Sequence, residues 1–279
     1  MSEDLKMYLS TGEVCKLFNI SKKTLFHYDS IGLFKPEKVL PNGYRYYSQY
    51  QLELFNVIYI LKEMDVPLAD IKDFLDNRCL DNSIEYLKYK ANEIEQVIQR
   101  LNRMQQIISN KIKIIKEGKS FKDEITIESQ DEEYLVLSNS IDRNKKFYDM
   151  DNYMSLIEYC NINNMNIGYP VGSIISKENL EKNIYDEHDY YFIKVDKNCL
   201  DDKILVKPKG LYVVGYSKGH YDKTPNIYSK LEEHINTNNL KIIGNSYEQI
   251  LIDEVATKYI NDYIIKVSIQ VEYVWNHKI

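Results

Sequence analysis

Residues 10–51 read STGEVCKLFNISKKTLFHYDSIGLFKPEKVLPNGYRYYSQYQ, and this stretch decides the fold of the N-terminal part of the chain. Ser10 with Glu13 fits the capping box, in which a hydroxyl and a reaching carboxylate or amide satisfy free backbone N–H groups at a helix start. Ser48 with Gln51 fits the same pattern. Helices are therefore predicted to begin at both serines.

A further helix start at Ser21 makes the pattern a helix-turn-helix. Only Asn19 and Ile20 separate the first helix from the second, and this spacing is typical of the motif whose second helix enters a DNA major groove. The second helix carries Leu25 and Tyr28. The side chains that the first helix is expected to bury are Val14, Leu17 and Phe18.

A tight turn is predicted at Pro41-Asn42-Gly43, because Asn and Gly tolerate the positive φ that a hairpin needs. A short wing bearing Tyr44, Arg45 and Tyr46 follows it. Residues 16–46 hold six Lys or Arg and two Asp or Glu, although the whole chain has a net charge of −6. This local excess can neutralise DNA phosphates, while an ordinary Lys-rich surface is the alternative.

The stretch resembles the MerR family of bacterial transcription regulators over roughly the first 78 residues. The most specific matches are the Gly-Tyr-Arg-Tyr-Tyr wing at 43–47, Ile31-Gly32-Leu33 followed by Pro36, and Leu61 through Asp70-Ile71. The resemblance implies an α+β protein with three parts. These are a winged helix-turn-helix DNA-binding domain (1–78), a long antiparallel coiled-coil dimerisation helix (79–119) and an effector-binding domain (120–279).

One departure from the family pattern lies in the second helix. Phe26 and His27 stand where the family usually has Arg followed by an aromatic residue, so one expected contact to the DNA backbone is missing. We expect DNA contacts from Lys22, Lys23, His27, Tyr28, Tyr44, Arg45 and Tyr46.

A heptad pattern from Asp81 to Gly118 predicts the dimerisation helix. The apolar residues recur in steps of three and four, and such a stripe needs a partner helix to cover it. They are Ile84, Leu87, Ala91, Ile94, Ile98, Leu101, Ile108, Ile112 and Ile115. The alternative is packing within the same chain. An antiparallel pair, which the family resemblance implies, would relate two heads by a two-fold axis and favour a pseudo-palindromic operator.

The pattern changes to strands after residue 122. Period-two alternation predicts a half-buried antiparallel strand over 263–273. Other strands are expected at 125–140, 168–176, 190–195, 211–216 and 242–252, with helices near 153–160 and 227–235. Strand, helix, strand, strand thus occurs twice, over about 125–197 and 203–274, which predicts a duplicated β-α-β-β domain.

This order resembles the GyrI-like effector-binding domain of the multidrug-sensing, BmrR-like branch of the family. The supporting segments are Lys207-Pro208-Lys209-Gly210-Leu211-Tyr212 and Ser246-Tyr247-Glu248-Gln249-Ile250-Leu251-Ile252. In that branch an aromatic pocket with a buried glutamate binds lipophilic cations. The resemblance therefore implies a small-molecule effector of this class.

Glu248 is the residue that decides the chemistry of the expected pocket. Alternation places it on one face with Ile250 and Ile252, so its carboxylate points towards an apolar interior. An ionised carboxylate is costly there unless a cation or hydrogen bonds compensate it. A ligand cation is one such partner. The alternatives are an edge strand that faces water, or pairing with a lysine or a tyrosine hydroxyl.

The family pattern assigns Tyr153, Tyr169, Tyr221 and Tyr263 to the same pocket, together with Ile250. Tyrosine faces attract desolvated cations, and the hydroxyl adds a polar handle. The chain holds 25 tyrosines. An AT-rich genome would also produce this excess, so the count alone proves nothing.

Composition narrows the class of protein further. A length of 279 residues favours two domains. No long apolar run or signal segment is apparent, so a cytoplasmic protein without a membrane partner is expected. The cysteines are scattered, which disfavours a disulfide scaffold and a metal site, and no cofactor is expected. They are Cys15, Cys79, Cys160 and Cys199.

The sequence thus predicts a homodimeric transcription activator that responds to an aromatic cation or drug. The family resemblance implies that the dimer bends and untwists promoter DNA so that RNA polymerase can engage it. We expect no catalytic residues, because the five histidines are dispersed. Two alternatives stay open: a GyrI-like hydrolase with a pocket glutamate as general base, and an architectural DNA-binding protein without an effector.

Overall fold

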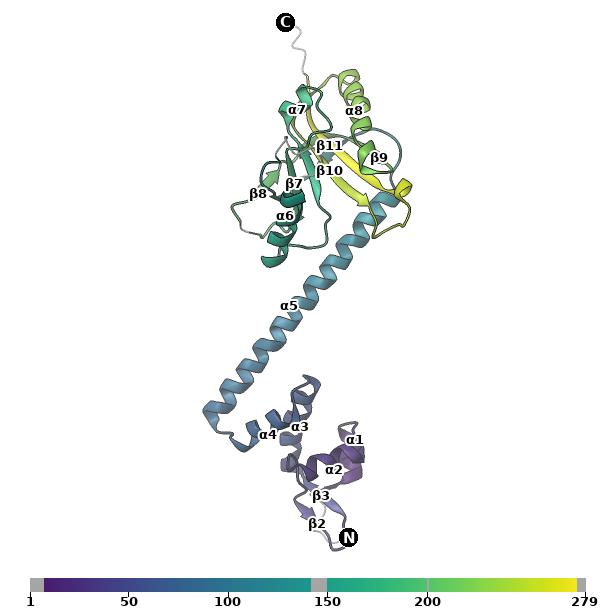
Figure 1. Ribbon diagram of the computed structural model, residues 1–279. Coiled ribbons are helices and arrows are strands. Elements are labelled where there is room, and N and C mark those ends of the chain that lie inside the picture. The colour runs from purple at the N-terminus through teal and green to yellow at the C-terminus, as the bar shows by residue number, and fades with distance from the viewer. Residues whose placement is uncertain (1–7, 142–149, 200, 275–279) are drawn as a thin grey trace. The chain divides into compact units, whose positions relative to one another are not determined.

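The computed structural model describes residues 8–141, 150–199 and 201–274. The chain divides into two compact units, up to Val97 and from Ile98 onward. The helices and strands of the first unit can be followed in Figure 1. They are β1 (Tyr8–Ser10), α1 (Thr11–Leu17), α2 (Lys22–Ser30), β2 (Lys38–Val39), β3 (Arg45–Ser48), α3 (Gln49–Glu63) and α4 (Leu68–Asp76).

Local capping confirms the predicted helix starts. Glu13 Oε2 accepts a hydrogen bond from Ser10 N–H at 2.7 Å, and Ser10 Oγ accepts from Glu13 N–H. Ser21 Oγ accepts from Thr24 N–H at 3.0 Å. At the start of α3, Gln51 Oε1 accepts a hydrogen bond from the N–H of the cap residue Ser48 at 3.1 Å.

The predicted turn before the wing is also present. Gly43 has a φ of 82°, which a side chain would strain, and its N–H donates to the carbonyl of Leu40. β3 pairs with β2 on one side and with β1 on the other, so the wing is part of a three-stranded antiparallel sheet.

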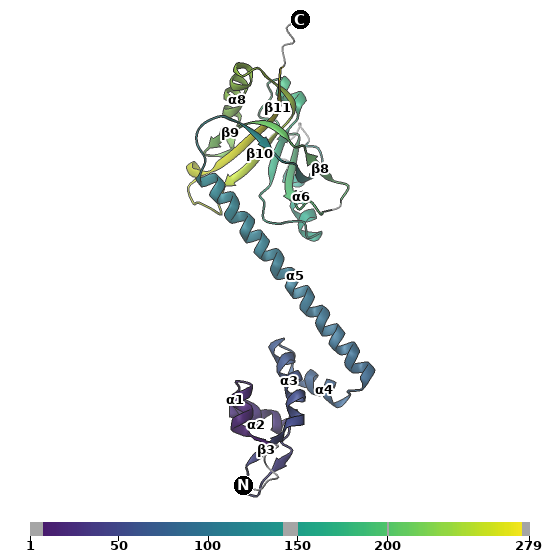
Figure 2. The ribbon, with the colours of Figure 1, turned by 180° about the vertical axis from the view of Figure 1, so that it is seen from behind.

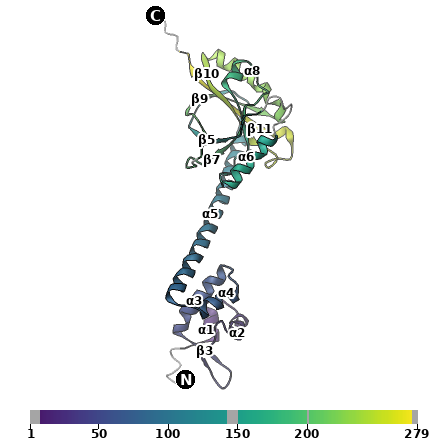
Figure 3. The ribbon, with the colours of Figure 1, turned by 60° about the vertical axis from the view of Figure 1, so that its left-hand side comes forward.

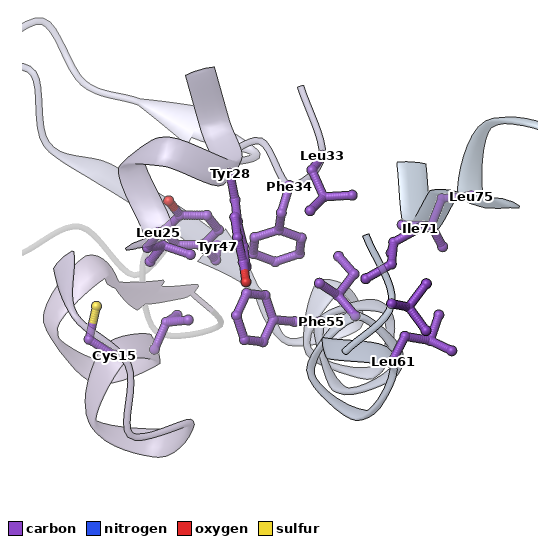
Figure 4. Packing of buried hydrophobic residues seen from close by; sticks show 13 residues of the cluster. Cys15, Leu25, Tyr28, Leu33, Phe34, Tyr47, Phe55, Leu61, Ile71 and Leu75 are labelled. Atoms are coloured by element: carbon purple, nitrogen blue, oxygen red, sulfur yellow. The ribbon is translucent and has the colours of Figure 1, made fainter. Parts of the chain in front are cut away.

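An aromatic cluster forms the core of the first unit, as Figure 4 shows. Phe34 stacks on Tyr47 at 5.3 Å between ring centroids and meets the edge of Phe55 at 4.8 Å. Val14 is fully buried as expected, but the expected burial of Leu17 was wrong, since 59% of it is exposed. Phe18, which was also expected in the core, is partly buried there, with its ring 4.5 Å from that of Phe55.

Helix α5 (Leu80–Lys119) runs through the division between the units and is 40 residues long, or about 60 Å at about 1.5 Å per residue. Most of its predicted stripe is uncovered within the chain, with exposed fractions between 40% and 59%. These residues are Ile84, Leu87, Ile94, Ile98, Leu101, Ile108 and Ile112. Within the described residues of each unit, these side chains are therefore left partly uncovered.

The second unit holds one eight-stranded antiparallel sheet in the order β4-β9-β11-β10-β6-β7-β5-β8. Its further elements are β4 (Thr126–Gln130), β5 (Glu133–Leu137), α6 (Met150–Ile162), β6 (Gly172–Ile175), α7 (Lys177–Glu181), β7 (Tyr190–Val195), β8 (Ile204–Lys207), β9 (Gly210–Lys218), η2 (Tyr221–Lys223), α8 (Pro225–Thr237), β10 (Leu240–Ile252), η3 (Ile260–Asp262) and β11 (Ile264–Tyr273).

The expected strand over 125–140 was wrong, because two strands occupy this range. The strand is interrupted at the acidic pair Asp131-Glu132. β4 then pairs with β9, whereas β5 pairs with β7 in another part of the sheet. Each half of the domain is therefore β-β-α-β-β rather than β-α-β-β, apart from the short α7. The sheet order is symmetric about the β10–β6 pair, with the first strand of each half paired to the other half.

The sheet is strongly curled (Figure 3). Lys207 Nζ at the end of β8 donates to Gln130 Oε1 at the end of β4 at 2.7 Å, although these are the two edge strands. The outer face is covered by α8 over one half and α6 over the other, as Figures 1 and 2 show from opposite sides.

The end of α5 packs directly on this domain. Ile114 is buried with Leu251 and Ile264. A side chain at Gly118 would come within 2.6 Å of Ile252, so this glycine allows the helix to approach β10 closely. An ion pair joins α5 to the residue that follows β10, because Lys111 Nζ lies 2.5 Å from Asp253 Oδ2.

Candidate functional site

The exposed face of α2 carries three of the residues expected to contact DNA. Lys22, Lys23 and His27 are exposed, and α2 follows α1 in the helix-turn-helix arrangement. Tyr28 lies elsewhere: only 8% of it is exposed, and burial raises the pKa of its hydroxyl. Its ring belongs to the aromatic core, as Figure 4 shows.

The wing residues lie beside this helix. Tyr44 is 63% exposed at the tip of the wing, whereas Arg45 and Tyr46 are half-buried in β3. Arg45 Nε donates to Asp29 Oδ2 of α2 at 2.8 Å, and its guanidinium lies 4.9 Å from the ring centre of Phe26. Phe26 thus supports the wing arginine from the position where the family usually has arginine.

A cavity of about 370 Å³ lies in the second unit between segments from both halves of the sheet. Four of the six residues expected there line it, namely Tyr153, Tyr221, Glu248 and Ile250. Tyr263 is 8% exposed and packs against Tyr221 with 5.6 Å between the ring centres. Tyr169 instead lines a second cavity.

Glu248 lies on β10 in the middle of the sheet and is only 6% exposed, so the alternative of an edge strand facing water was wrong. The hydroxyl of Tyr228 on α8 donates to its Oε1 at 2.8 Å. Ser173, its direct neighbour across the β10–β6 pair, donates to Oε2 at 2.8 Å. His188 Nε2 lies 3.0 Å from the same oxygen.

These contacts keep the carboxylate ionised. Burial alone would raise the pKa of Glu248, but the charge and hydrogen bond of His188, with the hydroxyls of Ser173 and Tyr228, hold it below its usual range. Burial opposes the protonated form of His188 in turn, yet the nearby Glu248 carboxylate raises the pKa of the imidazole above its usual range. The pair is therefore a hydrogen-bonded imidazole and carboxylate, which becomes a salt bridge when His188 is protonated.

Aromatic rings and a second carboxylate complete the wall. Tyr153 of α6 meets Tyr191 edge to face at 5.5 Å. Burial and the Glu254 carboxylate raise the pKa of Tyr221, whose hydroxyl donates to Glu254 Oε2 at 3.3 Å. The cavity thus combines tyrosine faces with carboxylates, which is the lining that favours a desolvated cation.

Three residues that act on Glu248 were not expected from the sequence. Tyr228, Ser173 and His188 come from α8, β6 and the segment before β7, which are far apart in the chain. A tyrosine hydroxyl had been one open alternative for the partner of Glu248, and this alternative is confirmed. Nothing in the sequence around His188 distinguishes it from the other dispersed histidines.

The second cavity, of about 330 Å³, lies where α5 meets the inside of the curled sheet. Tyr169 lies there with Lys194 Nζ 4.9 Å from its ring centre. Lys207 is 1% exposed and pairs with Glu133 Oε2 at 3.0 Å. Burial would raise the pKa of Glu133, but Lys207 and Lys194 lower it to about 2.

Within 8–141, 150–199 and 201–274, no three His, Cys, Asp or Glu side chains lie close enough together to hold a metal ion. None of the helices in those ranges has the length and apolar character needed to cross a membrane.

Known proteins resemble the chain along its whole length. Residues 9–78 match the MerR HTH family regulatory proteins. The chain is 38% identical over 278 residues to the multidrug-efflux transporter 2 regulator of Bacillus subtilis (strain 168), covering 98% of this chain and 100% of the relative. It is 26% identical over 291 residues to the multidrug-efflux transporter 1 regulator of that strain, covering 95% and 98%.

Among solved structures, the cryo-EM structure of the EcmrR–DNA complex in EcmrR-RPo matches with a TM-score of 0.40 and 20% identity, covering 95% of this chain and 100% of that chain. Identity of 38% along nearly all of both chains, with the match of residues 9–78, decides the family. The chain belongs to the MerR family of helix-turn-helix transcription regulators.

Proposed function

We propose that the protein is a homodimeric activator that binds double-stranded promoter DNA in the cytoplasm and responds to a lipophilic aromatic cation. The observation that carries the effector class is the buried, ionised Glu248 in a cavity walled by tyrosine rings. The relatives named as multidrug-efflux transporter regulators support an effector of drug-like chemistry.

The head supports binding to DNA through both charge and shape. Lys22 and Lys23 lie exposed at the N-terminal turn of α2, where the helix can contact phosphates or base edges. Arg45 lies beside α2, held by Asp29. The guanidinium still has N–H groups beyond Nε with which to bind a phosphate.

The α5 stripe supports a homodimer. Seven large apolar side chains along one helix remain 40% to 59% exposed, and a second copy of α5 in the antiparallel orientation would cover them. A two-fold axis through this pair would place two heads on a pseudo-palindromic site.

The cavity supports a ligand of moderate size. A volume of about 370 Å³ falls within the range of about 300–1,000 Å³ that is usual for small-molecule sites. The Thr224 hydroxyl on its wall is buried and has no hydrogen-bond partner among the described residues. An unpaired buried hydroxyl is costly, and a polar group of a ligand could satisfy it.

The route to activation in this proposal passes through the contact between α5 and the effector domain. Glu254 lines the cavity, and its neighbour Asp253 pairs with Lys111 of α5. Effector binding can favour one arrangement of this contact only through a difference in affinity between two conformations. The dimer would then bend and untwist the promoter for RNA polymerase, at a cost of several kcal/mol repaid by protein contacts.

Calorimetry on a matched pair of ligands tests the effector class. We expect the intact protein to bind tetraphenylphosphonium in the micromolar range, roughly −8 kcal/mol. Glu248→Gln keeps the shape and removes the charge, so it should weaken the cation by about 2 kcal/mol and neutral triphenylphosphine oxide far less. Equal losses for both ligands would contradict the proposal.

One control variant and two further measurements accompany the calorimetry. Glu181→Gln removes an exposed carboxylate on α7, outside the cavity, and should leave both affinities unchanged. Transcription with purified RNA polymerase should rise with the cation and lose this response in Glu248→Gln. Ligand recovered after prolonged incubation should be unchanged; a hydrolysed product would favour an enzyme.

A further inference from the structure

The Glu248 carboxylate already has a partner that can carry positive charge. His188 Nε2 lies 3.0 Å from Glu248 Oε2, and both side chains line the cavity. The His188 side chain is 27% exposed, against 8% for that of Glu248. The imidazole therefore lies nearer the solvent, in the position next to the carboxylate that a ligand cation needs.

The other partners of Glu248 are neutral hydroxyls. Tyr228 binds Oε1 from α8, and Ser173 binds Oε2 from β6. The hydroxyl of Tyr228 stays protonated because burial and the Glu248 charge raise its pKa. His188 is thus the contact of Glu248 in the described residues whose charge can change near neutral pH.

We propose that protonated His188 is the resident cation of this cavity, and that a cationic effector binds beside Glu248 as His188 releases its proton to solvent. This inference rests on the proposed function and adds its charge specificity. One N–H bond of the imidazolium breaks, the ring nitrogen keeps the electron pair, and buffer takes up the proton. One positive charge leaves as another arrives, so Glu248 stays compensated in both states.

The groups around His188 favour its protonated form in the free protein. Asp189 and Asp186 of its own segment add to the effect of Glu248. The charge of Asp189 is partly compensated, because it accepts from Ser176 N–H at 2.6 Å and from the Asn179 amide. The remaining titratable groups that line the cavity are Tyr153, Tyr191, His220, Tyr221 and Glu254.

The contact between Glu248 and His188 decides how cation affinity should change with pH. Since Glu248 raises the pKa of His188 in the free protein, His188 is protonated at a higher pH than an ordinary histidine. A bound cation would lower this pKa again by repulsion. Cation affinity should therefore fall by about tenfold per pH unit below the His188 pKa and become constant above it. Neutral ligands should lack this dependence.

Calorimetry in buffers of different ionisation enthalpy measures the released proton directly. With the full-length protein and tetraphenylphosphonium, the observed enthalpy should change with buffer in proportion to about one released proton near neutral pH. Triphenylphosphine oxide should release none. If tetraphenylphosphonium binds in a Glu248-dependent way but releases no proton, this inference is wrong and the proposed effector class remains. If no cation binds, both are wrong.

His188→Gln provides the second test, because its amide keeps a hydrogen-bond donor and cannot titrate. Proton release should disappear in this variant, and the fall in cation affinity of about tenfold per pH unit should be lost. His234→Gln is the matched control, since His234 borders a different hollow on α8 and should leave proton release unchanged. Proton release that persists in His188→Gln would overturn the inference.

Discussion

Arg45 of the wing donates from Nε to Asp29 Oδ2 of α2 at 2.8 Å, so one ion pair joins the wing to α2. The ring of Phe26 supports the same guanidinium at 4.9 Å. The side chains are 34% and 20% exposed, so this pair adds little stability. Its effect is to hold the guanidinium in one orientation relative to α2.

Arg45→Ala should therefore weaken operator binding by about tenfold or more, because a charge-assisted contact to phosphate is lost. It should also reduce the salt slope of binding by about one. Fluorescence anisotropy over a salt titration measures both quantities. Asp29→Asn is the matched control. It keeps every cation but removes the ion pair that orients Arg45, so operator affinity should fall while the salt slope stays unchanged. An unaltered slope in Arg45→Ala would mean that Arg45 contacts no phosphate.

The exposed stripe of α5 leads to a second prediction. Leu101→Glu places a carboxylate in the seam of the proposed coiled coil, where desolvation is costly. Sedimentation equilibrium should show monomers or unfolded protein. Gln96→Glu adds the same charge on the opposite side of the helix and should leave the dimer intact. A stable Leu101→Glu dimer would place the interface elsewhere.

Local patterns predicted the head well and the effector site less completely. The capping residues and apolar spacing of 10–51 act within a few residues of one another, so sequence order carries the information. The environment of Glu248 depends on β6, α8 and the segment before β7, which meet only in the folded sheet. A buried carboxylate was predictable from alternation, but its histidine partner was not.

The errors have a common physical origin. A period-two pattern does not show that one strand ends at an acidic pair such as Asp131-Glu132. Nor does it show that the next strand pairs in another part of the sheet. Helical spacing likewise placed both Leu17 and Phe18 in the core, since both lie close to the face of Val14, but Leu17 is 59% exposed. The ring of Phe18 makes the better contact with Phe55.

The ion pairs of Glu133 with Lys207 and Lys194 predict that acid destabilises the curled sheet. The pKa of Glu133 is lowered to about 2 from its usual value of 4.5, so its stabilising effect is present above about pH 4.5 and is lost as pH falls towards 2. Glu133→Gln should remove this transition and destabilise the domain by roughly 3 kcal/mol, because it leaves Lys207 buried without a charge partner. Urea unfolding between pH 3 and 7 measures both effects, and an unchanged pH profile would contradict them.

The contact between Lys111 and Asp253 predicts a variant that separates binding from activation. Lys111→Met keeps the aliphatic chain and removes the charge from the 2.5 Å pair. Cation affinity should change by less than about threefold, while activation in transcription with purified RNA polymerase should fall by at least half. Lys113→Met is the control, since it removes a neighbouring lysine charge and leaves the Asp253 pair intact. Full activation by Lys111→Met would show that the signal does not pass through this pair.

The unpaired hydroxyl of Thr224 predicts that Thr224→Val stabilises the ligand-free protein but weakens binding of ligands that carry a hydrogen-bonding group. Thr224 is 3% exposed, lines the effector cavity and has no hydrogen-bond partner for its Oγ1 among the described residues. Thr224→Val keeps the shape and removes the buried hydroxyl, so the ligand-free protein should become more stable, by about 1 kcal/mol. Thr257→Val provides a comparison at a hydroxyl that already accepts a hydrogen bond, from Tyr259 N–H, and should not stabilise the protein.

Binding of a ligand that carries a hydrogen-bonding group should weaken in Thr224→Val, whereas tetraphenylphosphonium, which has no such group, should bind as before. Thermal unfolding with and without each ligand measures both effects, and a lower melting temperature of ligand-free Thr224→Val would show that the hydroxyl has a partner in solution.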